Sequence, residues 1–337
     1  MRHRYALSFA LLALAAQAHA ADYKVANRFS VGGAGGWDYP SLDAPAHRLY
    51  IARGDHVQIV DTISGKEVAS IADTPGVHGV ALAPELGRGY ISCGKANAVK
   101  VFDLKTNAVI ANVPAGEVPD AIMYEPASRR VFAFNGRSHD ASVIDAKNNQ
   151  PVATIALGGK PEFAREDGKG LVYVNIEDTA ELVVIDAKNA KVKARYKLPQ
   201  CEEPTGLALD AKHRRSFSTC ANKNLVVLDI DSGKPVANVA IGDGSDGAEF
   251  DAASQTIFSA NGEGTLSVIH EVDANHYTAQ PALATQKSAR TLVLDAATHR
   301  LYLPAAEFGA PDAEHKRGAM VKDSFSVLVV EPAQAKP

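Results

Sequence analysis

The hydrophobic pattern of the chain repeats seven times. Each unit has a turn, a short apolar segment around an aromatic residue, a loop, a second apolar segment that ends in an acidic residue, another turn and a further strand-like segment. The aromatic positions are 40 to 44 residues apart: Tyr50, Tyr90, Phe132, Tyr173, Phe217, Phe258 and Tyr302. A period of roughly 40–45 residues with several short strands per unit is typical of β-propeller blades. The pattern therefore predicts an all-β protein, a seven-bladed β-propeller.

The second unit shows the expected blade most clearly. It predicts an inner strand at residues 79–82, a second strand at 89–93, a third at 98–102 and an outer strand at 109–113. The third strand ends at Asp103, and equivalent acids recur 41 to 43 residues apart: Asp61, Asp145, Asp186 and Asp229. Turn-forming residues follow each acid, as expected for hairpins.

The sixth unit departs from this pattern, because His270 and Glu271 stand where the other units have an aspartate. On paper this pair has the residue types of a metal or acid–base site. Its position at the end of a third strand places it on the face opposite the second-strand ends. We therefore interpret the pair as an ordinary, satisfied turn.

The seventh unit lacks an outer strand, since only six residues follow Glu331. Residues 24–32 resemble the outer strands at 109–115 and 152–158. We expect the N-terminal strand to close blade seven by pairing with Phe325–Val330, because joining the two ends of the chain in one sheet removes exposed strand edges.

The same unit carries an inserted loop at residues 304–324, without strand or helix periodicity. Loops of this size are usually either functional or disordered. The loop follows the end of a second strand, so we expect it to overhang the face where second strands end, as a candidate lid.

Residues 1–20 have the pattern of a cleavable signal peptide, with a basic start, an apolar run at 6–16 and small residues at 18–20. We therefore expect export to a bacterial periplasm and a mature protein, residues 21–337, that forms a single propeller domain. No remaining apolar stretch approaches the ~18 residues that span a bilayer. We expect no membrane span and a monomeric protein.

Charge and cysteine content narrow the partners and the compartment. The 35 basic residues include two in the signal-like segment, which leaves 33 against 39 acidic residues and a net charge of −6; this disfavours general attraction to DNA. Of three cysteines, Cys201 and Cys220 flank the first two strands of unit five at ends that share a face of a propeller. The alternatives are a Cys201–Cys220 disulfide or three buried thiols. Cys93 takes the place of Cys220 in unit two, and we interpret it as a packed strand-end residue.

One column of the repeat carries most of the candidate chemistry. Aligning the units on their aromatics places these residues at the start of the inner strands: Asp38, His78, Asp120, Glu162, Thr205, Asp246 and Arg290. Inner strands line the central channel, so we expect these side chains to ring its mouth. Trp37 lies beside Asp38, where it could stack on a ligand or plug the channel. Acids, an imidazole and a guanidinium in a concave opening suit a small polar ligand or a divalent cation. The alternative is a channel that is polar only because water fills it.

The opposite face should carry a broken basic rim. Arginines stand two residues before the blade aromatic in five units: Arg48, Arg88, Arg130, Arg215 and Arg300. Either their charge is offset by the third-strand aspartates near the same rim, or an anionic partner such as DNA docks there.

The second strands end in a loosely repeated motif, an aromatic followed by short residues and Asn or Arg: Tyr50-Ile-Ala-Arg53, Phe132-Ala-Phe-Asn135, Tyr173-Val-Asn175 and Phe258-Ser-Ala-Asn261. In this motif the chain resembles the YVTN-repeat family, the YncE-like exported bacterial seven-bladed β-propellers, over residues 21–337. The resemblance implies the fold and export. One member of this family is implicated in DNA binding, and propeller relatives include lactonases and streptogramin lyases. The resemblance therefore implies no single activity.

These observations favour a binding module over an enzyme. We expect the channel mouth to bind a small molecule, a metal or an exported protein, with a divalent cation as the one candidate cofactor. CxxC, HExxH, GxSxG and P-loop motifs are absent. The alternative is a metal-assisted hydrolase or lyase at the same mouth, with Glu162 or His78 as base and a cation held by Asp120 and Asp246. The third hypothesis is DNA binding through the basic rim.

Overall fold

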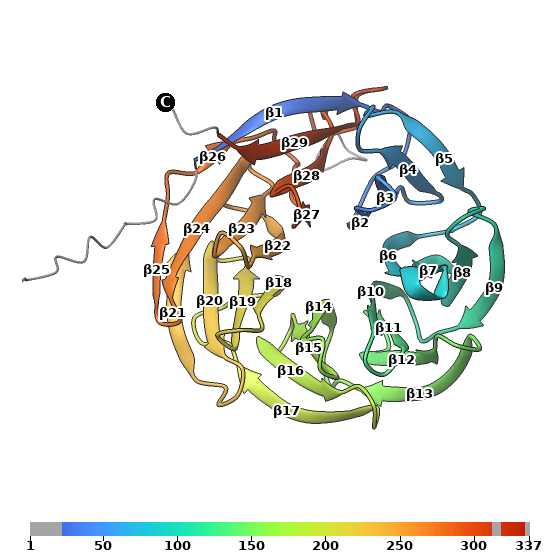
Figure 1. Ribbon diagram of the computed structural model, residues 1–337, viewed down its shortest axis with the longest axis horizontal. Coiled ribbons are helices and arrows are strands. Elements are labelled where there is room, and N and C mark those ends of the chain that lie inside the picture. The colour runs from blue at the N-terminus through green and yellow to red at the C-terminus, as the bar shows by residue number, and fades with distance from the viewer. Residues whose placement is uncertain (1–21, 312–317, 334–337) are drawn as a thin grey trace, which may run out of the picture.

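Seven antiparallel sheets form a closed ring around a central axis (Figure 1), which confirms the predicted seven-bladed β-propeller. The computed structural model describes residues 22–311 and 318–333. The predicted signal peptide at residues 1–20 lies outside the described residues.

Each of the first three blades is a four-stranded meander in chain order. Blade one contains β2 (Pro40–Asp43), β3 (Arg48–Ala52), β4 (Val57–Asp61) and β5 (Glu67–Ile71). Blade two contains β6 (Val77–Ala83), β7 (Arg88–Cys93), β8 (Ala98–Asp103) and β9 (Val109–Pro114), with two single-turn 3-10 helices, η1 (Pro84–Leu86) and η2 (Gly94–Ala96). Blade three contains β10 (Pro119–Glu125), β11 (Arg130–Asn135), β12 (Asp140–Asp145) and β13 (Gln150–Ala156).

The remaining blades repeat this arrangement with changes in the last two. Blade four contains β14 (Pro161–Glu166), β15 (Leu171–Ile176), β16 (Glu181–Asp186) and β17 (Lys191–Lys197). Blade five contains β18 (Pro204–Asp210), β19 (Arg215–Cys220), β20 (Asn224–Asp229) and β21 (Pro235–Ala240). Blade six contains β22 (Ser245–Asp251), β23 (Thr256–Asn261), β24 (Thr265–Asp273), β25 (His276–Ala279) and β26 (Leu283–Ala284). Blade seven contains β27 (Val293–Asp295), β28 (Arg300–Ala305), β29 (Ser326–Pro332) and β1 (Tyr23–Ser30).

The repeated residues have two structural roles. All seven blade aromatics are at most 3% exposed, and they belong to apolar clusters that join neighbouring blades. The third-strand acid closes the following turn: Asp103 Oδ1 accepts hydrogen bonds from the backbone N–H of Thr106 at 2.8 Å and from its hydroxyl at 2.9 Å. Asp61 and Asp229 bind the equivalent serines in the same way. The sequence repeat therefore reflects inter-blade packing and turn geometry.

The N-terminal strand closes the ring as predicted. In Figure 1, β1 lies against β29, and the antiparallel pairing runs from Tyr23 with Pro332 to Ser30 with Ser326. Of its two buried side chains, Tyr23 packs edge-on against Phe258 of the neighbouring blade six, and Phe29 packs against Tyr302 within blade seven.

Blade six differs from the sequence prediction. The pair His270 and Glu271 does not form a turn, because β24 continues to Asp273 and pairs with β25 through a hairpin. Glu271 is completely buried rather than placed in a solvated turn. Two short strands, β25 and β26, pair with the long β24 where other blades have one outer strand.

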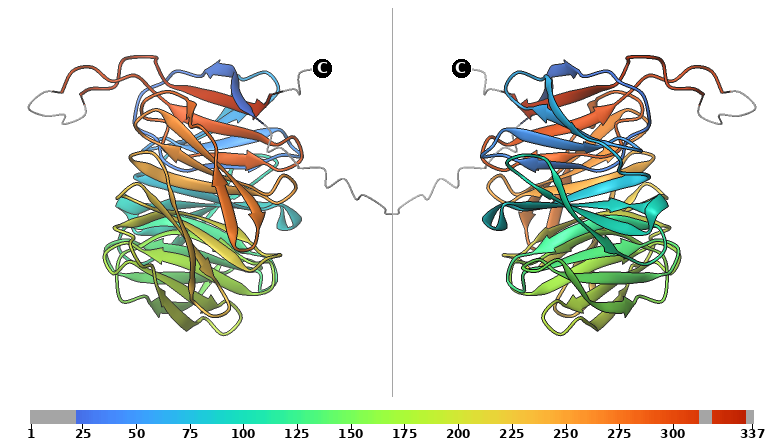
Figure 2. Two further views of the ribbon diagram at one scale, coloured as in Figure 1. Left: turned by 90° about the vertical axis from the view of Figure 1, so that its left-hand side faces the viewer. Right: turned by 90° about the vertical axis from the view of Figure 1, so that its right-hand side faces the viewer.

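The inserted loop of blade seven has a paired base in its described part. Phe308 bridges Met320, and the backbone of Gly309 and Val321 continues this ladder. Figure 2 shows this arm leaving the disc beside β28 and β29. Residues 312–317 lie outside the described residues.

Candidate functional site

The predicted column lies at one end of the innermost strands. His78, Asp120, Glu162, Thr205 and Asp246 are each the second residue of their strand, whereas Asp38 and Arg290 lie just before β2 and β27. Figure 1 shows these strands facing the ring centre. Because every blade contributes one residue at the same level, the side chains converge without any helix or long loop to position them.

Five of the seven residues form one connected charged group, which we call the mouth cluster: Asp38, His78, Asp120, Asp246 and Arg290. His78 Nδ1 lies 2.8 Å from Asp38 Oδ2 and 3.6 Å from Asp120 Oδ1. The Arg290 guanidinium lies 2.7 Å from Asp246 Oδ2 and 3.8 Å from Asp38 Oδ1. The mouth cluster therefore spans blades six, seven, one, two and three.

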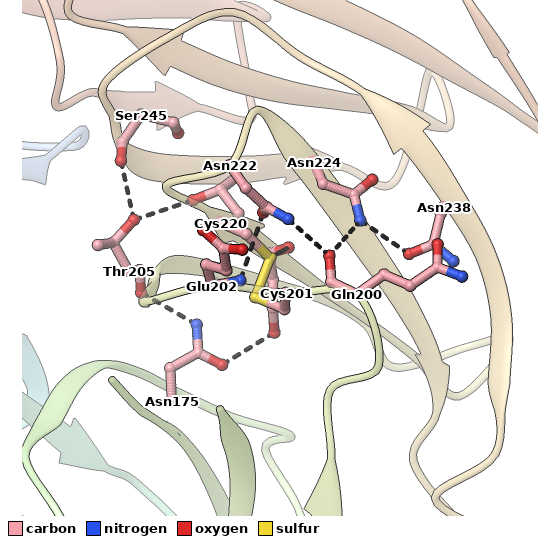
Figure 3. The surroundings of a disulfide bond; sticks show 12 residues. Asn175, Gln200, Cys201, Glu202, Thr205, Cys220, Asn222, Asn224, Asn238 and Ser245 are labelled. Carbon is pink, nitrogen blue, oxygen red and sulfur yellow. Dashed lines mark hydrogen bonds between the residues drawn. A yellow bond between two sulfur atoms is a disulfide. The ribbon is translucent and has the colours of Figure 1, made fainter. Parts of the chain in front are cut away.

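The other two members of the column have separate partners. Glu162 pairs with Lys160 at 2.7 Å, and Lys160 also contacts Glu177. Thr205 donates its hydroxyl to the backbone carbonyl of Ser245 at 2.8 Å, as Figure 3 shows, and this bond ties blade five to blade six. Lys160 and Glu177 were missed by the column alignment because they flank the inner and second strands instead of occupying the repeated position.

Trp37 belongs mainly to the core. Its ring is 6% exposed and packs against Phe308 and Phe325, with centroid distances of 6.0 and 5.4 Å. It still borders the mouth cavity, and its carbonyl accepts a hydrogen bond from Arg290. Its main contacts are therefore with the blade seven arm.

Tyr39, which sequence reasoning missed, follows Asp38 and packs edge-on against Phe163 at 4.8 Å. Burial raises its pKa well above the ordinary value, and the charges of Asp246 and Glu162 add to this effect. Tyr39 also lines a separate cavity of about 200 Å³.

A cavity of about 720 Å³ opens above the mouth cluster. Asp38, His78 and Arg290 contribute to its wall, together with glycines and apolar residues from blades one to three. Lys95 and Arg137 line it with exposed side chains, and neither forms an ion pair with another described residue. The cavity thus has acidic and cationic groups on different parts of its wall.

The pKa values of the mouth cluster reflect burial and crowding of like charges. Burial, followed by the Asp38 and Asp246 carboxylates, raises the pKa of Asp120 to about 6 although His78 opposes the shift. The hydrogen bond with Asp38 raises the pKa of His78 against the effect of burial. Burial and the Asp120 carboxylate also raise the pKa of Glu162, and they outweigh the ion pair with Lys160. The mouth therefore holds protons more tightly than isolated groups would.

The same residues offer a donor set for a cation. One oxygen each of Asp38 and Asp120 and one nitrogen of His78 lie within 4.8 Å of one another. Two carboxylates and an imidazole suit zinc and other first-row divalent metals. The alternative cation site, Asp120 with Asp246, is a pair of carboxylates and stays a prediction.

The last residues of the repeated motif, at the second-strand ends, are structural. The Arg53 side chain is completely buried and donates to the carbonyls of Gly32, Ala34, Gly35 and Gly36. The asparagines Asn135, Asn175 and Asn261 are also buried and bond to neighbouring side chains and backbone. Arg53 therefore fixes the glycine-rich segment that leads to Asp38.

The arginines of the opposite rim either donate to the next blade or pair with an acid of their own blade. Arg88 and Arg130 each donate to a carbonyl of the next blade at 2.7 Å, Ala146 and Ala187 respectively. Three others pair with the acid at the end of the third strand: Arg48, Arg215 and Arg300. These contacts match the interpretation of offset charge; DNA binding stays a prediction.

Of the two alternatives for the cysteines, the structure contains the Cys201–Cys220 disulfide. Cys201 and Cys220 are bonded beside Thr205 (Figure 3), and Cys93 is a buried free thiol. Burial raises the pKa of Cys93 to about 11, so it is unsuited to act as a nucleophile near neutral pH.

The fold and the mouth cluster together define the class of protein: a seven-bladed β-propeller with a charged channel mouth. Among the described residues no helix is long and apolar enough to cross a membrane. A scan against protein-family models and a search of curated proteins found no match. The YVTN-repeat resemblance therefore stays a prediction.

Proposed function

We propose that the protein is a binding module that takes a small organic ligand into the mouth cavity, with a cationic group of the ligand at Asp38 and Asp120. The observation that carries this proposal is the charge balance. Five acids surround the mouth, and two permanently charged cations contact four of them. Lys160 pairs with Glu162 and Glu177, and Arg290 pairs with Asp246 at 2.7 Å and lies 3.8 Å from Asp38. Among the described residues, His78 is the one side chain within hydrogen-bond distance of the Asp38 carboxylate, and it also lies 3.6 Å from Asp120. A ligand cation would compensate this excess of carboxylates.

The size and lining of the cavity favour an organic ligand over a bare ion. A volume of about 720 Å³ lies within the range of small-molecule sites. Lys95 and Arg137 line the same cavity with cationic groups, which could bind an acidic group of the ligand. The proposed ligand is therefore a compound with both an amino and an acidic group, such as an amino acid or a short peptide.

We further propose export, followed by action in an oxidising compartment. The signal-like residues 1–20 support this proposal, and the Cys201–Cys220 disulfide is compatible with it. Membership of the YVTN-repeat, YncE-like family is likewise a proposal, supported by the fold and by the second-strand motif.

The test is a thermal-shift screen of residues 21–337 with amino acids, dipeptides and simple amines, followed by calorimetric titration of any compound that binds. Asp120→Asn should weaken binding of amines about 10-fold or more, because a charge-assisted contact contributes about 1.5–3 kcal/mol. Lys95→Ala combined with Arg137→Ala should weaken only ligands that have an acidic group. Glu203→Gln, an exposed acid outside the cluster, is the matched control.

Two outcomes would contradict the proposal. If Asp120→Asn binds every compound as the wild type does, the carboxylates do not hold the ligand. If Zn²⁺ or Mn²⁺ binds at the mouth cluster and no organic compound does, the metal alternative is correct.

A further inference from the structure

A second group of ionisable side chains lies between blades five and six, at the end of the disc opposite the mouth. Asp210 ends β18, His213 lies in the turn before β19, and Glu271 lies in β24. We call them the blade 5–6 cluster. One donor atom from each lies within 4.8 Å of the other two. Asp210 is 3% exposed and Glu271 is completely buried, whereas the side chain of His213 is 24% exposed.

Glu271 breaks the repeat at a position that is apolar in blades two to five and is Thr62 in blade one. The backbone N–H of this position donates to a carbonyl of the turn between the first two strands in blades one to six. The equivalent residues in blades two to five are all apolar: Leu104, Ala146, Ala187 and Ile230. A completely buried carboxylate in such a position is costly unless a cation or a proton compensates it.

The hydrogen bonds within the blade 5–6 cluster leave this cost uncompensated. Asp210 Oδ1 accepts the backbone N–H of Lys212, a turn contact repeated in other blades, and Glu271 Oε1 accepts the Tyr277 hydroxyl at 3.5 Å. Asp210 Oδ2, His213 Nδ1 and Glu271 Oε2 are buried without a hydrogen-bond partner among the described residues. His213 Nδ1 lies 2.7 Å from Asp210 Oδ2 and 3.3 Å from Glu271 Oε1, yet neither contact has hydrogen-bond geometry.

The nearest arginine does not serve as the counter-ion. Arg215 Nη1 pairs with Asp229 at 2.7 Å and also donates to the carbonyls of His213 and Arg214. Its Nε donates to the carbonyl of Ala274, and its Nη2 donates to the side chain of Asn275. The His213 imidazole is the ionisable group that lies close to both carboxylates.

We propose that Asp210, His213 and Glu271 form a divalent transition-metal site, with Zn²⁺ as the best-fitting ion. Two carboxylate oxygens and one imidazole nitrogen are common zinc ligands, and a water molecule would complete the tetrahedron. Ligand atoms about 2.0–2.2 Å from zinc lie roughly 3.3–3.6 Å apart in a tetrahedron, so the three groups need only small side-chain rotations. The partly exposed ring of His213 gives the ion a path from solvent. The bound ion would join blades five and six.

The experiment measures Zn²⁺ binding to residues 21–337 by calorimetry after removal of metal with a chelator. We expect the wild type to bind Zn²⁺, and Glu271→Gln and His213→Gln to weaken that binding at least 10-fold. Asp120→Asn in the mouth cluster is the control that separates the two sites, and it should keep the blade 5–6 ion. Co²⁺ as a substitute should give the strong visible absorption of a tetrahedral complex, and His213→Gln should remove it.

A second variant protects the test against a folding failure. Glu271→Leu introduces an apolar residue, as blades two to five have at this position, so it should abolish this Zn²⁺ site while the metal-free protein becomes more resistant to urea. The proposal is overturned if the wild type takes up no Zn²⁺, or if Glu271→Leu and His213→Gln bind Zn²⁺ as tightly as the wild type.

Discussion

Removal of the Phe29 ring should show how strongly β1 holds the propeller closed. Phe29 is 7% exposed and packs against Tyr302, and its ring also lies over Gly65 of blade one, where an added Cβ would be 2.3 Å from Phe29 Cδ1. The side chain thus joins the N-terminal strand to blade one as well as to blade seven. Phe29→Ala removes a buried ring at this junction, and large-to-small changes of this kind cost about 3–5 kcal/mol.

The assay is urea unfolding followed by far-UV circular dichroism and by the fluorescence of Trp37, the one tryptophan, which is buried beside Phe325. A loss of about 3–5 kcal/mol is a large share of the roughly 5–15 kcal/mol that stabilises a typical protein, so the unfolding midpoint should fall clearly. Val25→Ala is the control on the same strand, because Val25 is 38% exposed; it should change stability by about 0.5 kcal/mol or less. If Phe29→Ala and Val25→Ala have the same midpoint, β1 does not lock the ring.

Three further predictions concern other contacts. Burial raises the pKa of Asp120 from 3.8 to about 6, so its contribution to stability is fully present below pH 3.8 and is lost as pH rises to about 6. The raised pKa of His78 adds a further loss above pH 6.5. Asp120→Asn should therefore flatten the plot of urea midpoint against pH between about pH 4 and 6, and an unchanged slope there would contradict this. Cys201→Ala should cost about 3 kcal/mol, the loop entropy of a bond between cysteines 19 residues apart, and should make stability insensitive to reductant. Arg53→Lys should cost at least about 2 kcal/mol by urea unfolding, because an ammonium cannot reach all four carbonyls; wild-type stability would refute that role.

Most of the fold could be predicted because each blade repeats the same local rules. Aromatics such as Tyr90 pack between blades, and acids such as Asp103 close the turns, so their spacing in the sequence reports directly on the architecture. The closure by β1 could also be predicted, since its alternation matches that of outer strands. The column from Asp38 to Arg290 could be found because a ring places equivalent positions at one level.

The rest depended on contacts between side chains that the repeat does not align, and one sequence does not display these contacts. Lys160 reaches Glu162 and Glu177 from outside the aligned column. Arg53 has the residue type of a surface ligand contact, yet it is buried under glycine carbonyls. Glu271 resembles a turn acid in the sequence, but its burial follows from the length of β24 and from the position of blade five. A comparison of Glu271 with Ile230 and the equivalent residues of the other blades was the one sequence signal that could have revealed its burial.

The most direct test of the central claim is calorimetric titration of the mouth with the tightest compound from the screen, on wild type and on Asp120→Asn. We predict that the wild type binds a compound with an amino group and that the variant binds it about 10-fold or more weakly, while Glu203→Gln is unchanged. Equal affinity of all three proteins for that compound would show that the mouth cluster is not the binding site.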